Sequence, residues 1–106
     1  MHTILKYTLG PDSEIIMPMG ARILSVSVEN DEIVLWALGD TGAPTESRYI
    51  IPVQEGREFP FRPEHTIFIG TAQRIIGNDI MTTHVFEVLF RAIEEQIRGY
   101  DGKAKK

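Results

Sequence analysis

The feature that most constrains the fold is a pair of apolar segments that meet at an Asn-Asp turn. In residues 22–29 (RILSVSVE), apolar side chains alternate with serines, which is the period-two pattern of a strand with one buried face. Asn30 and Asp31 follow, and both residue types tolerate the positive φ angles of a tight hairpin turn. Residues 32–38 (EIVLWAL) return as a strand that is apolar on both faces. The sequence therefore predicts a hairpin whose second strand is central in the fold or lies at an oligomer interface.

Further strands are predicted on both sides of this hairpin. Residues 65–88 predict a second hairpin, because Gly77-Asn78-Asp79 separates two strand-like stretches. Shorter strands are expected where apolar stretches end near glycine or proline, over residues 2–9, 15–17 and 47–51. Pro52 is expected to stop the last of them, because proline has no N–H to donate to a neighbouring strand. Residues 55–64 are the longest irregular segment and a natural place for a binding loop.

The spacing of apolar residues changes after these strands. From Leu89 to Ile97 they recur at helical spacing beside charged residues, which predicts a helix over about residues 89–99. Residues 100–106 are expected to form a basic, flexible tail. The pattern as a whole predicts a mostly β fold (α+β by count of elements). We expect a single domain over residues 1–99, an antiparallel β-sandwich or small barrel built of hairpins with one C-terminal α-helix.

Composition narrows the class of protein. A chain of 106 residues is one domain, since a second core would need roughly 50 more residues. The absence of cysteine excludes disulfides, thiolate metal ligands and cysteine nucleophiles, and is compatible with the reducing cytoplasm. No segment approaches the run of about 18 apolar residues that spans a bilayer, so no membrane partner is expected. The net charge of −4 argues against duplex nucleic acid as a partner.

Motifs that would support catalysis or metal binding are incomplete. His84 and Glu87 have the spacing of a metal or acid–base pair on a helix, but on a strand this spacing sends them to opposite faces. The three histidines lie in separate elements, so we expect no metal site and no cofactor. The Asp-Thr-Gly triplet at 40–42 resembles the aspartic protease signature, but a plain turn is favoured because the chain holds no second copy. We therefore predict a protein without catalytic residues and keep an enzyme of unspecified class as an alternative.

Side chains suited to a planar, anionic ligand are better represented. Arginines are fork-shaped donors, and aromatic rings are stacking surfaces. The candidate ligand-binding residues are Arg22, Trp36, Arg48, Tyr49, Arg74 and His84, and the other arginines considered as donors are Arg57 and Arg62. An acidic protein that gathers arginines in one pocket could bind a nucleotide. The alternative is that each arginine pairs with one of the 15 carboxylates and each aromatic ring packs in the core.

Five blocks of sequence form an ordered series. They are ILKYTL at 4–9, IMPMGARILSV at 16–26, LWAL at 35–38, IGTAQ at 69–73 and HVFE at 84–87. In this order and spacing they resemble a small, uncharacterised domain family that is common in bacteriophages and prophage-bearing bacteria. The family implies no activity, so no functional residue is carried over from it. Two features depart from its pattern: Gly39 stands where a bulkier apolar residue is expected, and the helix after residue 88 resembles an added piece for oligomerisation.

The resemblance implies a phage-type protein that acts in the cytoplasm of a bacterial host by occupying a host component. Our principal hypothesis is a non-enzymatic inhibitor of bacterial anti-phage defence, which sequesters a nucleotide immune signal or blocks a host protein. Its expected partners are a host protein or a small nucleotide-like ligand, and we expect it to form a homo-oligomer. The alternative is a minor virion or assembly component that joins partners through its strand edges.

Overall fold

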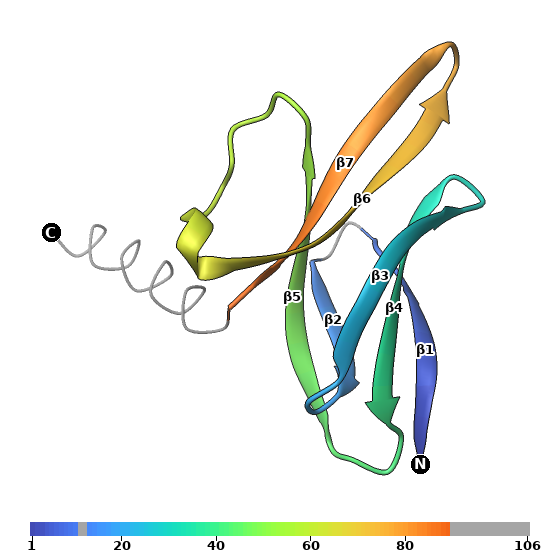
Figure 1. The fold of residues 1–106 in the computed structure, drawn as a ribbon, viewed down its shortest axis with the longest axis vertical. Helices are drawn as coiled ribbons and strands as arrows, with labels where there is room; N and C mark the ends of the chain where they lie inside the picture. Colours follow the sequence, from blue (N-terminus) through green and yellow to red (C-terminus); the bar gives the residue numbers. More distant parts are fainter. Residues whose placement is uncertain (11–12, 90–106) are drawn as a thin grey trace, which may run out of the picture.

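The computed structural model describes residues 1–10 and 13–89, which form two antiparallel β-sheets packed against each other (Figure 1). The three-stranded sheet has the order β1–β4–β3 and consists of β1 (His2–Thr8), β4 (Glu32–Asp40) and β3 (Arg22–Glu29). The four-stranded sheet has the order β2–β5–β7–β6 and consists of β2 (Glu14–Pro18), β5 (Thr45–Gln54), β7 (Asp79–Val88) and β6 (Thr66–Ile76). A 3-10 turn, η1 (Pro63–His65), precedes β6.

Both predicted hairpins are confirmed. In the β3–β4 hairpin, Asn30 and Asp31 have φ angles of 50° and 62°, the left-handed backbone that a two-residue turn requires. The apolar strand β4 is central in its sheet, between β1 and β3. In the β6–β7 hairpin, Gly77 supplies the positive φ of the turn, at 63°. Of the two architectures expected, the barrel is wrong, because the described strands divide into two sheets.

The prediction that Pro52 stops a strand is wrong, because β5 continues through Pro52 to Gln54. The N–H of Ile50 points toward β2 and donates to the carbonyl of Ser13 at 2.7 Å. Backbone N–H directions alternate along a strand, so the nitrogen of Pro52 faces the same side, but it lies beyond Glu14, the first residue of β2. The missing N–H of Pro52 therefore costs no ladder hydrogen bond.

The core lies between the two sheets. Leu35 of β4 and Ile50 and Val85 of the four-stranded sheet are fully buried within it. The edge strands β3 and β6 approach closely, because an added Cβ at Gly70 would lie 2.7 Å from Cγ1 of Val26. Glycine therefore allows these two edges to close one side of the sandwich.

Gly39 is explained by packing of the same kind. A Cβ at this position would lie 3.1 Å from Cγ of Pro18 and 3.4 Å from Cβ of Ala21. In this chain, Pro18 at the end of β2 and Ala21 in the turn that follows already occupy the space that a bulkier residue would need.

The predicted C-terminal helix over residues 89–99 and the basic tail over 100–106 lie outside the described residues, apart from Leu89. The backbone N–H of Leu89 donates to the carbonyl of His65, which places the end of the described chain beside η1. Within the part of the chain that the structure describes, no helix is long and apolar enough to cross a membrane.

Candidate functional site

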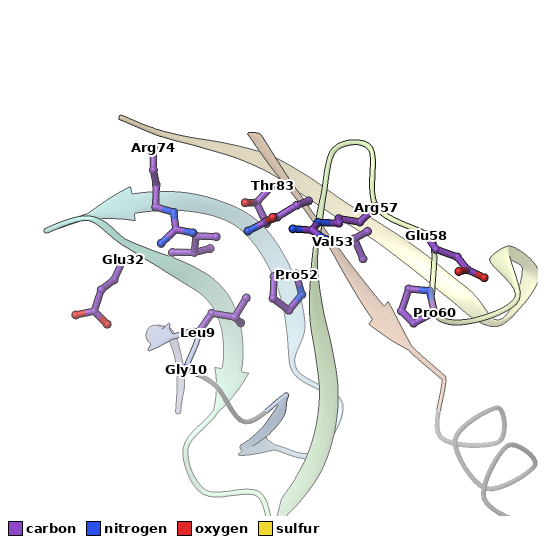
Figure 2. A pocket seen from close by; sticks show the side chains of 12 residues that line it. Leu9, Gly10, Glu32, Pro52, Val53, Arg57, Glu58, Pro60, Arg74 and Thr83 are labelled. Carbon is purple, nitrogen blue, oxygen red and sulfur yellow. The ribbon is translucent and has the colours of Figure 1, made fainter. Parts of the chain in front are cut away.

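A pocket of about 430 Å³ opens between the two sheets, near the turn of the β3–β4 hairpin (Figure 2). Its walls come from the start of β4, the end of β5, the inner faces of β6 and β7, and the segments that follow β1 and β5. Five apolar side chains contribute to these walls: Leu9, Ile33, Pro52, Val53 and Pro60. A volume of this size lies within the range of small-molecule sites, in which apolar walls surround a few polar groups.

Two arginines reach into this pocket from different elements. Arg57 extends from the loop after β5, and Arg74 extends from β6 on the face that Ala72 buries in the core. Figure 2 shows their side chains entering from opposite sides and pointing toward the middle. Within residues 1–10 and 13–89, neither guanidinium lies within 4.0 Å of a carboxylate oxygen. The pocket therefore contains two cationic side chains that described carboxylates do not neutralise.

Arg74 is only partly satisfied by the protein. Its Nη1 donates to the carbonyl of Asp31 at 3.3 Å, and its Nη2 lies 3.4 Å from the sulfur of Met81. Its Nε is buried and has no hydrogen-bond partner among the described residues. A thioether is a weak acceptor, so Arg74 keeps donor capacity for a further group.

Thr83 adds a second unpaired polar atom to the pocket lining. This residue is only 1% exposed, and its Oγ1 has no hydrogen-bond partner in the described part of the chain. Buried hydroxyls are nearly always hydrogen-bonded, and leaving one unpaired costs about 1–3 kcal/mol. Two such atoms at one pocket indicate a place where a ligand or water completes the hydrogen bonding.

Two carboxylates also line the pocket. Glu32 lies at the start of β4, and Glu58 follows Arg57 in the loop after β5. In Figure 2 the two carboxylates lie toward opposite ends of the pocket, with both arginines between them. With two arginines and two glutamates, the described residues of the lining have a formal charge of zero.

Arg48 lies at the other end of the space between the sheets, and each of its three guanidinium nitrogens donates a hydrogen bond. Its guanidinium donates to both carboxylate oxygens of Glu87, and its Nη1 donates to the carbonyl of Ala21 at 2.8 Å. The hydrogen bond to Glu87 raises the pKa of Arg48 above its usual range, although partial burial opposes this. For Arg48, the alternative of a structural ion pair is therefore the one observed.

The other four candidate residues lie on the outer faces of the sheets. Trp36 and Arg22 share the outer face of the three-stranded sheet, where the indole Nε1 donates to Oγ of Ser27 at 3.0 Å. Tyr49 and His84 lie on the outer face of the four-stranded sheet. Of the six candidates, the structure therefore brings only Arg74 to the pocket.

The residues with the H-x-x-E spacing lie apart, as predicted. His84 shares a hydrogen bond of 2.9 Å with the hydroxyl of Thr71 on the outer face, whereas Glu87 faces the interior and binds Arg48. Among the described residues, no group of three or more histidine, aspartate or glutamate side chains is placed to hold a metal ion.

The Asp-Thr-Gly triplet forms a turn at the end of β4. The carboxylate of Asp40 accepts hydrogen bonds from the amino group of Met1 at 2.8 Å and from the backbone N–H of Gly42 at 3.0 Å. These bonds hold the pKa of Asp40 below its usual value. Asp40 is therefore an acceptor that organises this turn.

Several pocket residues were missed from the sequence. Arg57 was one of the arginines considered but was not among the six candidates, although it lies in the segment predicted as a binding loop. Combining those two observations would have selected it. Glu58 lies in the same predicted loop but was not considered, whereas Thr83 and Glu32 carried no sequence signal, because their position at the pocket depends on how the two sheets pack.

A second surface is apolar rather than charged. On the outer face of the four-stranded sheet, the ring centroid of Phe86 lies 4.9 Å from that of Phe59 and 5.4 Å from that of Phe68. Phe68 is 55% exposed, and at the far end of the same hairpin the paired residues Ile75 and Ile80 are also exposed. This face presents apolar area that the described residues do not cover.

Fold and site together define a small β-sandwich with a charged pocket between its sheets. The sequence matches the family model described as "Domain of unknown function (DUF7352)" over residues 1–95, and the chain belongs to that family. No curated protein and no solved structure matches the sequence. The match continues beyond residue 88, so the segment after β7 is not the added piece that was expected. The association with phages stays a prediction.

Proposed function

We propose that this protein is a non-catalytic binding protein that holds a small anionic molecule between its two sheets. The observation that carries this proposal is the meeting of Arg57 and Arg74 at one pocket without a carboxylate partner among the described residues. Guanidinium groups form short, charge-assisted hydrogen bonds with carboxylates and phosphates. The unpaired hydroxyl of Thr83 adds a neutral donor beside them.

The chemistry of the lining favours binding over turnover. The described lining contains no histidine, lysine, serine or tyrosine that could serve as a nucleophile or proton carrier at neutral pH, and its two carboxylates, those of Glu32 and Glu58, lie toward opposite ends of the pocket rather than beside one reacting group. Arginine stays protonated in proteins and therefore does not act as a base. The hydroxyl of Thr83 would need an adjacent base to become a nucleophile, and it makes no hydrogen bond to one within the described chain.

Phosphate groups suit this pocket better than nucleobases do. Trp36 and Tyr49 were the expected stacking surfaces, but they lie on the outer faces of the two sheets. No aromatic side chain is among the described residues that line the pocket. Sequestration of a nucleotide immune signal would therefore depend on its phosphate rather than on stacking of its base. That role, action in the bacterial cytoplasm and the blocking of a host protein stay predictions.

Calorimetric titration of the purified protein with small phosphates and carboxylates tests the proposal. We expect at least one of them to bind, and we expect Arg57→Gln and Arg74→Gln each to weaken binding about tenfold or more. Charge-assisted hydrogen bonds contribute about 1.5–3 kcal/mol, and each 1.4 kcal/mol is a factor of ten in affinity. Arg62→Gln is the matched control, because Arg62 precedes η1 and is not part of the pocket lining. Binding that is absent, or equal in all three variants, would overturn the proposal.

We propose a protein-contact role as a second candidate, because apolar side chains are exposed on the four-stranded sheet. Ile75 is 73% exposed and its cross-strand partner Ile80 is 65% exposed. Paired apolar residues at a hairpin end are a suitable surface for a partner or for a second copy. We expect light scattering after size exclusion to give a mass above that of one chain, and the double variant Ile75→Thr, Ile80→Thr to lower it. A monomer in both cases would leave homo-oligomerisation through this surface without support.

A further inference from the structure

The charges along the pocket follow an order that limits what the ligand can be. In Figure 2, Glu32 lies at one end and Glu58 at the other, while Arg74 and Arg57 point toward the middle. Thr83 also lines this pocket, and its buried hydroxyl has no partner among the described residues. The centre therefore attracts negative charge, and each end attracts a hydrogen-bond donor or a positive charge.

We propose that the ligand is a phosphodiester whose single negative charge lies between the two arginines and whose two arms carry hydroxyl or amino groups. This inference rests on the proposed function, because it concerns the same pocket. The phosphate oxygens accept hydrogen bonds from Arg57, Arg74 and Thr83. The arms extend toward Glu32 and Glu58, which accept hydrogen bonds from their hydroxyl or amino groups.

The position of the charge favours a diester over a monoester. A monoester or a simple carboxylate has its anion at one end of the molecule, so it would extend toward only one of the two glutamates. A diester has its anion in the middle and a substituent on each side. This arrangement matches a pocket in which both arginines lie between the two glutamates.

The amount of charge supports the same choice. The two arginines and two glutamates sum to zero, so the described residues of the lining have no excess positive charge to balance a polyanion. A second negative charge, whether on the same phosphate or on an arm, adds to the repulsion by Glu32 and Glu58 while the positive charge of the described lining stays the same. A phosphodiester keeps one negative charge at neutral pH, whereas a phosphomonoester carries close to two.

The directions of the donors fit a tetrahedral anion. Arg57, Arg74 and Thr83 come from a loop, from β6 and from β7, so they approach the centre from three separate elements. A carboxylate accepts hydrogen bonds best near its own plane, whereas phosphate oxygens point in several directions. Donors from three separate elements therefore suit phosphate better than a planar carboxylate.

Matched pairs of probes test the inference by calorimetry on the full chain. The diesters are sn-glycero-3-phosphoethanolamine, which represents a lipid headgroup, and the dinucleoside phosphate UpU, which represents a nucleotide source. The matching monoesters are O-phosphoethanolamine and UMP. We expect at least one diester to bind about tenfold more tightly than its monoester, and the diester that binds identifies the source.

The outcomes separate this inference from the proposed function. If a monoester binds as tightly as its diester, and Arg74→Gln loses this binding, the proposal of a phosphodiester ligand is overturned. The proposal of an anion-binding pocket is then retained. If no anion binds, or if binding ignores Arg57 and Arg74, both proposals are overturned.

Glutamate variants provide an independent readout. We expect Glu32→Gln and Glu58→Gln to weaken binding of the diester about threefold to tenfold and to strengthen binding of inorganic pyrophosphate, because a repelling charge is removed. Glu64→Gln is the control, because Glu64 lies in η1 and not in the pocket lining. Equal effects of all three variants would contradict the proposal that Glu32 and Glu58 contact the two arms of the ligand.

Discussion

Arg48 and Arg74 occupy equivalent positions at opposite ends of the same interior and differ in what surrounds them. Both extend from the four-stranded sheet toward the three-stranded sheet. Arg48 binds both oxygens of Glu87 and the carbonyl of Ala21, whereas Arg74 has one carbonyl, one thioether and an unpaired Nε. Two arginines in one interior therefore differ in how many of their donors the fold satisfies, and this difference is the ground on which we propose a structural role for Arg48 and a binding role for Arg74.

The largest expected effect on stability is at the end of the interior where Arg48 binds Glu87. Glu87→Ala leaves the guanidinium of Arg48 half-buried without its carboxylate, and we expect the free energy of unfolding to fall by about 2–4 kcal/mol. Urea denaturation measures this change. The double variant Arg48→Met, Glu87→Leu is the control and should recover most of the loss, since an apolar pair needs no neutralisation. A loss below about 1 kcal/mol in Glu87→Ala would contradict the structural role of this pair.

The next effect is a gain in stability and concerns Thr83 at the pocket. Thr83→Val keeps the shape of a fully buried side chain and removes its unpaired hydroxyl, so we expect the unliganded protein to gain about 1 kcal/mol of stability. The same variant should bind the anion more weakly. Thr82→Val, one residue earlier on the outer face, is the control and should change stability little. A destabilised Thr83→Val protein would indicate that the hydroxyl is already satisfied.

A smaller effect is expected when Arg74 itself is replaced. Arg74→Met should change the free energy of unfolding by less than about 1 kcal/mol, because an apolar chain of similar length replaces a poorly satisfied guanidinium. Binding of the anion should be lost. Urea denaturation and calorimetry on the same sample separate the two effects. A loss of stability as large as that of Glu87→Ala would show that Arg74 is a structural residue like Arg48, and would contradict the difference in role between them.

The smallest effect on stability is expected at Asp40, an exposed carboxylate outside both the Arg48–Glu87 pair and the pocket. Hydrogen bonds from the amino group of Met1 and from Gly42 lower the pKa of Asp40 below its usual value of 3.8 in the folded state. Its contribution to stability is therefore fully present above pH 3.8 and is lost as the pH falls through the lowered folded-state pKa. We expect thermal unfolding of Asp40→Asn to depend less on pH below this value than that of the parent protein. Equal pH dependence of the two proteins would show that the contact does not persist in solution.

The strands were predictable because their signals are local. Alternating apolar residues and the turns at Asn30-Asp31 and Gly77 depend on neighbours in the sequence, and the structure confirms both hairpins. The error at Pro52 arose from a distant cause, since the proline nitrogen faces the side of β2 but lies beyond the first residue of that strand. The choice between sandwich and barrel likewise depends on how strands far apart in sequence pair.

The site was predictable only as a residue type. Arginines line the pocket, but which arginines do so was not predictable, because Arg48 and Glu87 are separated by 39 positions and nothing local distinguishes that paired arginine from Arg74. The hydroxyl of Thr83 gave no signal, because a threonine in a strand is common whether or not its oxygen finds a partner.

Side-chain NMR of the arginine Nε–H groups tests the central claim most directly, because Arg48 and Arg74 are observed in one sample. The claim predicts that adding the anion that calorimetry identifies shifts the Nε–H signals of Arg74 and Arg57 and leaves that of Arg48 in place. In the unliganded protein, the Nε proton of Arg48 should exchange with solvent most slowly, because it is hydrogen-bonded to the carboxylate of Glu87. A shift confined to Arg48, or no shift at Arg74 while the anion is bound, would contradict the assignment of the pocket as the binding site.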